Sequence, residues 1–383
     1  MTLSLPLPNL AAQYLLDPQV IYLNHGSFGA VPRPVFQAYQ HWQRELEANP
    51  VDFLGRRAPG LLADARQALG AFINATGDDL AFVPNVTYAM NIVARALPLE
   101  EGDEILSTDH EYGAIDRAWR FKCEKSGARL VRRPVSLPVV DRQQAAEQIW
   151  GGVNERTRVI SLSHITSPTA LILPVEEICT RASEAGILTV IDGAHAPGQI
   201  DLDMQEIGAD FYCGNCHKWL SSARGAGFLY ARPGRQHLLE PLVVSHGWRS
   251  ESPGPSPFLD NFSWSGTIDP AAYLSVPAAI DFWEENDWPE VSSACHRLLA
   301  ECEERILALS GLPPISPETM WAQMRLVLLP GSAESYGPHL EENRIVVPVG
   351  QQRGHTGIRI SVQAYNCPAD LDRLVQVLRD AAA

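Results

Sequence analysis

Short apolar runs alternate with helical stretches along much of this chain, from about residue 80 to residue 230. Apolar strands separated by helices are typical of a mostly parallel sheet that is buried on both faces. We therefore predict an α/β fold in which a mostly parallel seven-stranded sheet is sandwiched by helices. The last two runs lie about 14 residues apart with no clear helix between them, so that pair is a candidate for antiparallel pairing. The predicted strands are 80–83, 104–107, 129–132, 159–162, 188–191, 211–213 and 227–230.

A loop rich in proline, serine and glycine, at residues 251–257, ends this alternation. A final helix begins at Pro368, a favourable first helical position, and repeats apolar residues at helical spacing. Between the two, the pattern predicts a smaller α+β domain. Its elements are helices near 270–285 and 288–309 and strand-like runs at 325–329, 343–347 and 357–361.

The length of 383 residues allows one large and one smaller domain. We predict an N-terminal arm at 1–20 that packs on the small domain, a large domain at 21–260 and a small domain at 261–383. In an alternative division, the helices within 270–309 bridge the two domains.

The composition restricts the class of partner. A formal net charge of −15 argues against nucleic acid or an anionic membrane as the main partner, because both require basic patches. No apolar run reaches the roughly 18 residues that span a bilayer, and Met1 to Pro6 shows no basic segment typical of a signal peptide. Seven scattered cysteines, an odd number, fit free thiols in a reducing compartment. We expect a cytoplasmic protein that acts on small molecules.

Lys218 stands out because the chain contains three lysines against 27 arginines. It follows a predicted strand and lies among aromatic residues and thiols, whereas Lys122 and Lys125 lie in a polar stretch typical of a solvated helix face. A primary amine can lose its proton and attack a carbonyl, which a guanidinium cannot do. Lys218 is therefore a candidate Schiff-base residue. The alternative is a lysine whose charged end reaches solvent from the edge of the core.

The segment just before Lys218 matches a second, different pattern. Cys213, Cys216 and His217 have the spacing of a covalent haem attachment site, and of a redox or metal-binding pair. Haem attachment needs an exported, oxidising setting, and a zinc site needs a second pair of ligands that the sequence lacks. We favour two buried thiols at the end of a strand, and we predict no metal site.

Three further positions are candidates for ligand binding, and the first two follow strands of the large sheet, where a parallel sheet binds ligands. Asp192 comes directly after an apolar strand. It is either a partner for a pyridinium nitrogen or a cap of the next helix. Asn85 to Thr87 begins a helix, where backbone N–H groups hold phosphate or where Asn or Thr caps the helix. Arg359 lies on a strand of the small domain and is suited to grip a carboxylate, although many arginines here are merely solvated.

Taken together, these motifs resemble the class V aminotransferase family of fold type I pyridoxal-phosphate enzymes over nearly the whole chain. The opening segment Tyr22 to Ala30 is similar to the isopenicillin N epimerase-like branch in particular. The motifs that carry the resemblance, in the family's order, are Asn85-Val86-Thr87, Asp109-His110-Glu111-Tyr112, Asp192-Gly193-Ala194-His195, His217-Lys218, Ser265-Gly266-Thr267 and Arg359-Ile360-Ser361.

The resemblance implies a role for each matching residue. Lys218 carries pyridoxal phosphate as a Schiff base, Asp192 keeps the pyridine nitrogen protonated, and His195 lies near the phenolic oxygen. Arg359 binds the substrate α-carboxylate, with Asn24 and His25 also at the substrate. An aromatic ring stacks on the cofactor, with Tyr112 preferred over His110. Ser167 stands where relatives often carry an Asn near the cofactor oxygen. The residues implied to hold the phosphate are Val86, Thr87, Asn215 and His217, with Gly266 and Thr267 reaching it from the second subunit of a homodimer.

The implied activity begins with an external aldimine of an amino acid, from which Lys218 removes the α-proton. Epimerisation is the leading prediction. It needs a second proton donor, which is expected on the stacking side of the cofactor, with Tyr112 or His110. The alternatives are a carbon–sulfur β-lyase similar to hercynylcysteine sulfoxide lyases, an aminotransferase and, from a different class, a non-catalytic cofactor carrier. A cysteine desulfurase is rejected, because residues 331–358 contain no Cys before Arg359. Arg56 and Arg57 are either contacts for an anionic substrate side chain or a solvated pair.

Overall fold

The fold is given by a computed structural model, which describes residues 10–352 and 354–382. Its largest sheet has seven strands in the order β2-β8-β7-β6-β5-β3-β4. All adjacent pairs are parallel except those of β8, which runs antiparallel to both of its neighbours. The predicted α/β architecture and the antiparallel last pair are confirmed. The strands are β2 (Leu80–Val83), β3 (Glu104–Thr108), β4 (Arg129–Arg133), β5 (Thr157–Ser163), β6 (Leu188–Gly193), β7 (Phe211–Asn215) and β8 (Gly227–Ala231).

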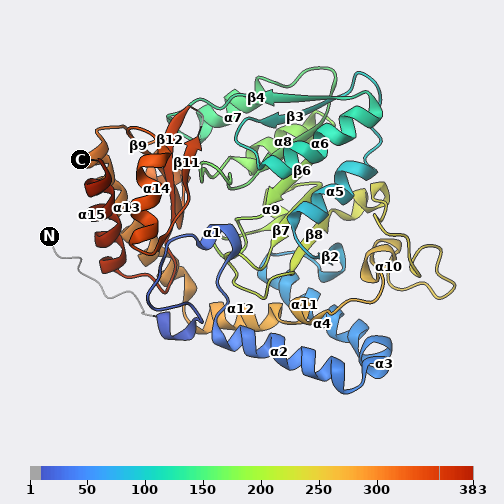
Figure 1. The fold of residues 1–383 in the computed structure, drawn as a ribbon. Helices are drawn as coiled ribbons and strands as arrows, with labels where there is room; N and C mark the ends of the chain where they lie inside the picture. The colour runs from blue at the N-terminus through green and yellow to red at the C-terminus, as the bar shows by residue number, and fades with distance from the viewer. Residues whose placement is uncertain (1–9, 353, 383) are drawn as a thin grey trace.

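Both faces of this sheet are buried, which explains why its strands are continuously apolar. Val159 and Val190 point to one face, where they share a hydrophobic cluster with α5 and α6. Ile160 and Ile191, one residue further along the same strands, point to the opposite face and pack with α7 and α8. Figure 1 shows the helices on the two sides of the sheet. These helices are α5 (Val86–Ala96), α6 (Gly113–Ser126), α7 (Arg142–Trp150) and α8 (Val175–Glu184), with the short α9 (Met204–Ile207) after β6.

A second, three-stranded antiparallel sheet with the order β11-β12-β9 forms the core of the C-terminal part. Its strands are β9 (Met324–Leu329), β11 (Val349–Gln352) and β12 (His355–Ser361), and its helices are α13 (Trp288–Ser310), α14 (Ala333–Glu342) and α15 (Pro368–Ala382). The sequence did not predict β11, which is short and polar. The run predicted at 343–347 is extended only as β10 (Ile345–Val346), which pairs in parallel with β1 (Ile21–Tyr22) near the N-terminus.

The N-terminal segment runs along the junction of the two parts. The backbone of Leu10 bonds to Ala364, and the ring of Tyr14 lies edge-on against Tyr365. Residues 1–9 of the predicted arm lie outside the described residues. After β1 come α1 (His25–Phe28), α2 (Arg33–Ala48), α3 (Pro50–Asp52), a π-helical turn at Phe53–Arg57 and α4 (Ala58–Phe72).

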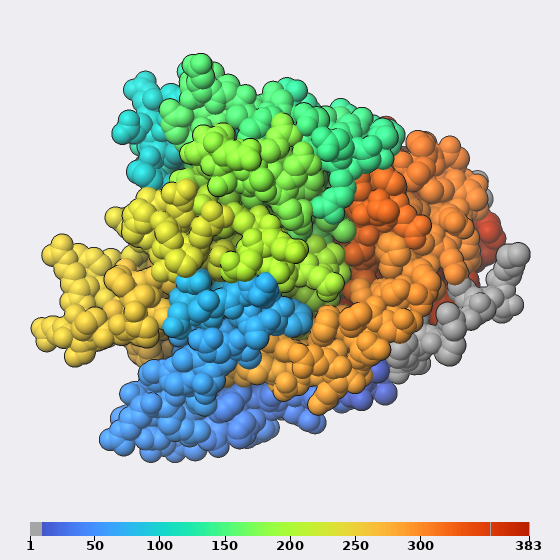
Figure 2. Space-filling model, turned by 180° about the vertical axis from the view of Figure 1, so that it is seen from behind, coloured from blue at the N-terminus to red at the C-terminus, as the bar shows by residue number. Residues whose placement is uncertain are grey.

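The helices within 270–309 contact both parts of the molecule. α12 (Val276–Glu285) packs against α2 and α4, whereas α13 packs against β9 and α15. Figure 2 shows the orange residues of this region between the blue N-terminal helices and the red C-terminal residues. The bridging of the two domains by these helices and the boundary near 260 both stay predictions. The remaining helices are α10 (Pro257–Ser263) and α11 (Ala271–Leu274).

Within the residues that the structure describes, no helix combines the length and the apolar character needed to cross a membrane.

A buried ion pair links the small sheet to helix α13. Arg325 of β9 is fully buried, and its Nε donates to Glu303 Oε1 of α13 at 2.6 Å. Its remaining nitrogens donate to the hydroxyl and the carbonyl of Ser316. Because Arg325 is paired with Ile360 and the next residue of β9 with Arg359, the pair lies on the sheet face opposite Arg359.

We predict that Arg325→Met destabilises the protein by about 3–5 kcal/mol, because Glu303 is left as an uncompensated buried charge. The exposed pair between Arg297 and Glu290 provides the matched control, so Arg297→Met is expected to cost at most about 1 kcal/mol. Urea unfolding followed by circular dichroism measures both. The double change Arg325→Met and Glu303→Met should recover most of the loss, and a double variant as unstable as the single one would contradict this account.

Candidate functional site

Lys218 lies in the turn after β7, beside side chains from the end of β6. Its Nζ is 3.2 Å from His195 Nε2, and both Asp192 and His195 are buried. Adjacent strands of a parallel sheet end at the same edge, which is why residues 26 positions apart in sequence meet there. The structure therefore brings together the three residues that the sequence placed at the Schiff base.

The hydrogen bonds of His195 determine the charge of Lys218. Trp219 Nε1 donates to His195 Nδ1 at 3.3 Å, and an indole N–H can only donate. Burial lowers the pKa of His195 well below its usual value, so the ring is neutral and carries its single proton on Nε2. That proton points at Lys218 Nζ, which can accept it only as an uncharged amine.

The electrostatics of the amine lead to the same state. Desolvation lowers the pKa of Lys218 to about 8, partly opposed by the nearby Asp192 carboxylate and reinforced by Arg359. The pKa of Asp192 is raised, first by burial, while the backbone N–H of Ala194 at 2.9 Å and the charge of Lys218 act in the opposite direction. A substantial fraction of Lys218 is thus a free nucleophile near neutral pH.

The N-terminal segment fixes the backbone of the lysine turn. His25 is buried and bonds through Nε2 to the carbonyl of Lys218 at 2.8 Å and through Nδ1 to the hydroxyl of Tyr365 at 3.0 Å. Gly29 has a positive φ of 69°, and a Cβ there would lie 2.3 Å from the carbonyl oxygen of His217. His25 is therefore a support of the turn, and its predicted contact with substrate stays a prediction.

The first turn of α5 faces the same sheet edge. Asn85 caps the helix by accepting from the backbone of Tyr88 at 3.0 Å, and the backbone N–H of Val86 donates to Asn215 Oδ1 at 2.9 Å. Thr87 is exposed on this turn. His217 bonds through Nδ1 to the carbonyl of Ala226 at 2.9 Å. The arrangement is a helix N-terminus with polar side chains around it, which suits an anion.

Arg359 enters from the small domain. Its Nη2 donates to Ser27 Oγ at 3.0 Å, and its Nη1 bonds to the carbonyl and the hydroxyl of Ser167. Its Nε is buried and has no hydrogen-bond partner among the described residues. The guanidinium lines a cleft of about 290 Å³ between the two domains, together with Tyr112 and Gln352. A guanidinium that lines a cleft is suited to a carboxylate ligand.

Of the two aromatic candidates, only Tyr112 is accessible from this cleft. The His110 ring is buried, with Nδ1 bonded to Thr169 at 2.8 Å and Nε2 bonded to the carbonyl of Val135 at 2.8 Å. Tyr112 is about half exposed and lines the cleft. This geometry favours Tyr112 over His110 as the ring available to a ligand.

Some predicted residues lie elsewhere. Gly266 and Thr267 occupy a loop outside the Lys218 cluster, where Thr267 lines a surface cavity with residues of α3 and the π-helical turn. Asn24 accepts from Ser27 at 2.6 Å and so reaches Arg359 only indirectly. Arg56 and Arg57 are paired with Asp52 and Glu45 on the surface.

The thiols of the Cys-x-x-Cys-His segment are both buried, and burial raises the pKa of Cys213 and of Cys216. Protonated, buried thiols are poor metal ligands. Within the described part of the chain, no group of three or more His, Cys, Asp or Glu side chains is arranged to hold a metal ion.

One residue of the site was missed by the sequence prediction. Glu111 is held by Thr108 and Ser163 at the ends of β3 and β5, and it lines the cleft with Tyr112 and Arg359. Its position inside the quoted Asp-His-Glu-Tyr motif was the only available signal.

The residues present fit pyridoxal phosphate. An uncharged amine at Lys218 suits its aldehyde, the carboxylate of Asp192 suits a protonated ring nitrogen, and the α5 N-terminus suits a phosphate. The guanidinium of Arg359, which lines the cleft, suits the substrate carboxylate.

Known proteins resemble this chain over nearly its whole length. An isopenicillin N epimerase of Streptomyces clavuligerus is 38% identical, covering 95% of each chain, and one of Amycolatopsis lactamdurans is 35% identical, covering 97% of this chain and 98% of its own. A probable chloroplastic L-cysteine desulfhydrase of Arabidopsis thaliana is 29% identical, and the match covers 94% of this chain and 82% of its own.

Solved structures share the fold. A cysteine desulfurase of Thermococcus onnurineus NA1 superposes with a TM-score of 0.85 at 21% identity, covering 99% of both chains. The lyase C-DES, in a variant with glycine covalently linked to its pyridoxal-phosphate cofactor, superposes with a TM-score of 0.84 at 23% identity, covering 96% of this chain and 98% of its own.

The sequence profile described as "Aminotransferase class-V" matches residues 21–374. Together with the near-full-length relatives, this match confirms the family inferred from the motifs: the chain belongs to the class V aminotransferase family and is a pyridoxal-phosphate enzyme.

Proposed function

We propose that this enzyme epimerises an amino acid at Cα in the manner of an isopenicillin N epimerase. The observation that carries the proposal is the Lys218 amine, whose uncharged form is favoured by the bond from Trp219 to His195 and by desolvation. An uncharged amine at that place is the base that removal of an α-proton requires. The near-full-length similarity to two isopenicillin N epimerases favours return of the proton to Cα over the other outcomes.

The chain's residues divide the work between binding and proton transfer. When bound, pyridoxal phosphate supplies an electron sink for the carbanion that forms at Cα. Asp192 holds a negative charge for the ring nitrogen, and Val86, Thr87, Asn215 and His217 hold the phosphate. Arg359 binds the α-carboxylate and orients the Cα–H bond, and Lys218 removes the proton.

Epimerisation also needs a proton donor on the second face of Cα. Tyr112 is the candidate, because it lies in the cleft with Arg359, whereas the His110 ring is engaged on both nitrogens. A phenol can donate a proton and recover it from solvent through the open cleft. Lys218 and Tyr112 then act from opposite sides of the substrate.

Carbon–sulfur β-elimination is the second candidate, since it begins with the same proton removal and a relative is named as an L-cysteine desulfhydrase. Release of pyruvate and ammonia distinguishes it from epimerisation. We propose that the enzyme is not a cysteine desulfurase, because residues 331–358 carry no Cys and Cys367 follows Arg359 at the start of α15. The fold similarity to a desulfurase does not bear on this chemistry.

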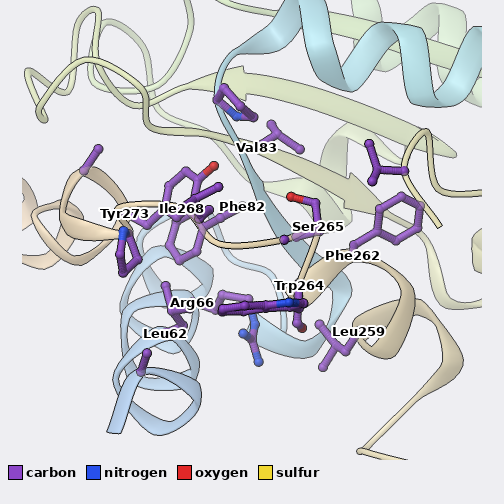
Figure 3. Close-up of a pocket in the computed structure, with 18 of the residues that line it drawn as sticks. Leu62, Arg66, Phe82, Val83, Leu259, Phe262, Trp264, Ser265, Ile268 and Tyr273 are labelled. Carbon is purple, nitrogen blue, oxygen red and sulfur yellow. The ribbon is translucent and has the colours of Figure 1, made fainter. Parts of the chain in front are cut away.

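We further propose a homodimer in which Thr267 completes the phosphate site of the partner subunit. The support is its place outside the Lys218 cluster, on a loop that carries the exposed Ile268. The same loop borders a cavity of about 600 Å³. Figure 3 shows the apolar side chains in that cavity, including Phe82, Trp264 and Tyr273. Such an apolar surface is typical of a contact between subunits.

We predict that Lys218→Ala abolishes fixation of the cofactor by borohydride and lowers α-proton exchange in deuterated water by about 10²–10⁴-fold, the usual contribution of a general base. Lys125→Ala, on the exposed face of α6, should leave both unchanged. An amino-acid panel assayed for exchange, for the D/L ratio and for pyruvate measures the outcome. Exchange that persists at the same rate in the Lys218 variant would overturn the assignment.

The pH dependence of Lys218 follows from its lowered pKa. In the cofactor-free full-length chain, trace acetylation at Lys218 should reach half of its maximal rate near pH 8, because only the uncharged amine reacts. In the urea-unfolded chain, the midpoint should move up towards 10.5. Peptide mass spectrometry measures both profiles. Equal midpoints in the two states would show that burial does not act on this amine.

We predict that Arg359→Met weakens substrate binding by about 10–100-fold, since a charge-assisted hydrogen bond contributes about 1.5–3 kcal/mol. Cofactor affinity should stay unchanged, because Arg359 bonds to Ser27 and Ser167 rather than to the phosphate-binding residues. Spectral titration with amino acid and with cofactor separates the two. Loss of cofactor affinity without loss of substrate affinity would contradict the assigned role.

A further inference from the structure

The carboxyl group of Glu111 is held between two strand ends of the large sheet. Its Oε1 accepts from Thr108 Oγ1 at 2.6 Å, and its Oε2 accepts from Ser163 N at 2.8 Å and from Ser163 Oγ at 2.6 Å. These bonds tie the turn between β3 and α6 to the end of β5. The proton transfers proposed above do not use this group.

The sheet register places Glu111 beside Asp192. Ser163 of β5 is the register partner of Asp192 of β6, so their Cα atoms lie about 4.8 Å apart and their side chains point to the same face. Since the hydroxyl of Ser163 bonds to Glu111, the carboxyl of Glu111 lies on the face to which Asp192 points. Glu111 and Asp192 therefore lie on the same face of the sheet, at neighbouring strand ends, on the side where the cofactor ring nitrogen is expected.

Charged and titratable groups surround this pair of acidic residues. Asp192 faces Glu111 from β6, Arg359 and Tyr112 line the same cleft, and Asp109 and His110 belong to the same turn. Lys218 and His195 lie beyond Asp192. Burial raises the pKa of Glu111 to about 7; the bonds from Ser163 and Thr108 lower it, and the charge of Asp192 raises it.

We propose that Glu111 is a positioning residue of the cofactor site, which acts on the cofactor ring through Asp192 and releases one proton when a cationic ring nitrogen docks there. The inference rests on the proposed function. Burial, and to a lesser extent the nearby charge of Asp192, disfavours the carboxylate form of Glu111, which therefore keeps its proton below neutral pH. A docked cation offsets the charge of Asp192, which favours ionisation of the Glu111 carboxyl, its proton passing to solvent. By reciprocity, the new carboxylate strengthens retention of the proton on the ring nitrogen.

The test is the pH dependence of cofactor affinity, measured by absorbance titration of the cofactor-free full-length chain with pyridoxal phosphate. Release of one proton makes affinity rise with pH, by up to about tenfold per pH unit below pH 7. Lys218, with its own pKa of about 8, is also charged below pH 7, and its contribution to the slope is common to the wild type and the Glu111 variant. Ionisations of the free cofactor contribute equally to every variant.

Glu111→Gln keeps the size and an acceptor oxygen but cannot titrate, so its slope below pH 7 should be smaller than that of the wild type by one proton. Glu124→Gln, on the exposed face of α6, removes the same charge far from the site and should retain the wild-type slope. Ser163→Ala keeps the carboxyl of Glu111 but removes one hydrogen bond to its charged form. The pH range over which cofactor affinity rises should therefore move to higher pH.

The outcomes are distinct. A wild type that binds no pyridoxal phosphate at any pH overturns the proposed function and this inference with it. A wild type that binds, with an equal slope in Glu111→Gln, overturns the inference alone. If circular dichroism shows that Glu111→Gln does not fold, Ser163→Ala decides. A shift to higher pH in the range over which cofactor affinity rises supports the role of Glu111, and no shift rejects it.

Discussion

The direction of one hydrogen bond sets the chemistry of this site. Trp219 can only donate to His195, so the neutral imidazole must keep its proton on the nitrogen that faces Lys218. A protonated lysine there would leave two donors facing each other in a buried place, which is costly. Desolvation of the amine acts in the same sense. The fold therefore favours the uncharged form of the lysine before any ligand arrives.

That state depends on parts of the chain that are far apart in sequence. The turn that bears Lys218 is held by His25 and by the close approach of Gly29, near the N-terminus. Arg359 arrives from the small domain and is held by Ser27 and Ser167. The site thus assembles only when the N-terminal segment, the large sheet and the small sheet are packed together. Changes that loosen this packing are expected to alter the amine as well as the fold.

The sequence predicted those features that depend on local pattern. The alternation of apolar strands and helices predicted the large sheet, and strand ends predicted Asp192 and Lys218. Long-range contacts were not predicted. β10 pairs with β1 across more than 300 residues, and the position of Glu111 in the site depends on its hydrogen bond from Ser163. The sequence could only prefer Tyr112 over His110, because the choice depends on which ring is already hydrogen-bonded.

The fate of the carbanion depends on the surroundings of Lys218 rather than on the lysine itself. Both epimerisation and β-elimination need the same amine, the same Asp192 and the same carboxylate contact at Arg359. They differ in what faces Cα and Cβ from the cleft, which is formed by Tyr112, Glu111 and the β11–β12 hairpin. A proton donor there returns Cα to an amino acid, whereas a leaving group on Cβ diverts it. Variation in this cleft, with the lysine turn kept constant, is therefore a physical route by which one fold supports both reactions.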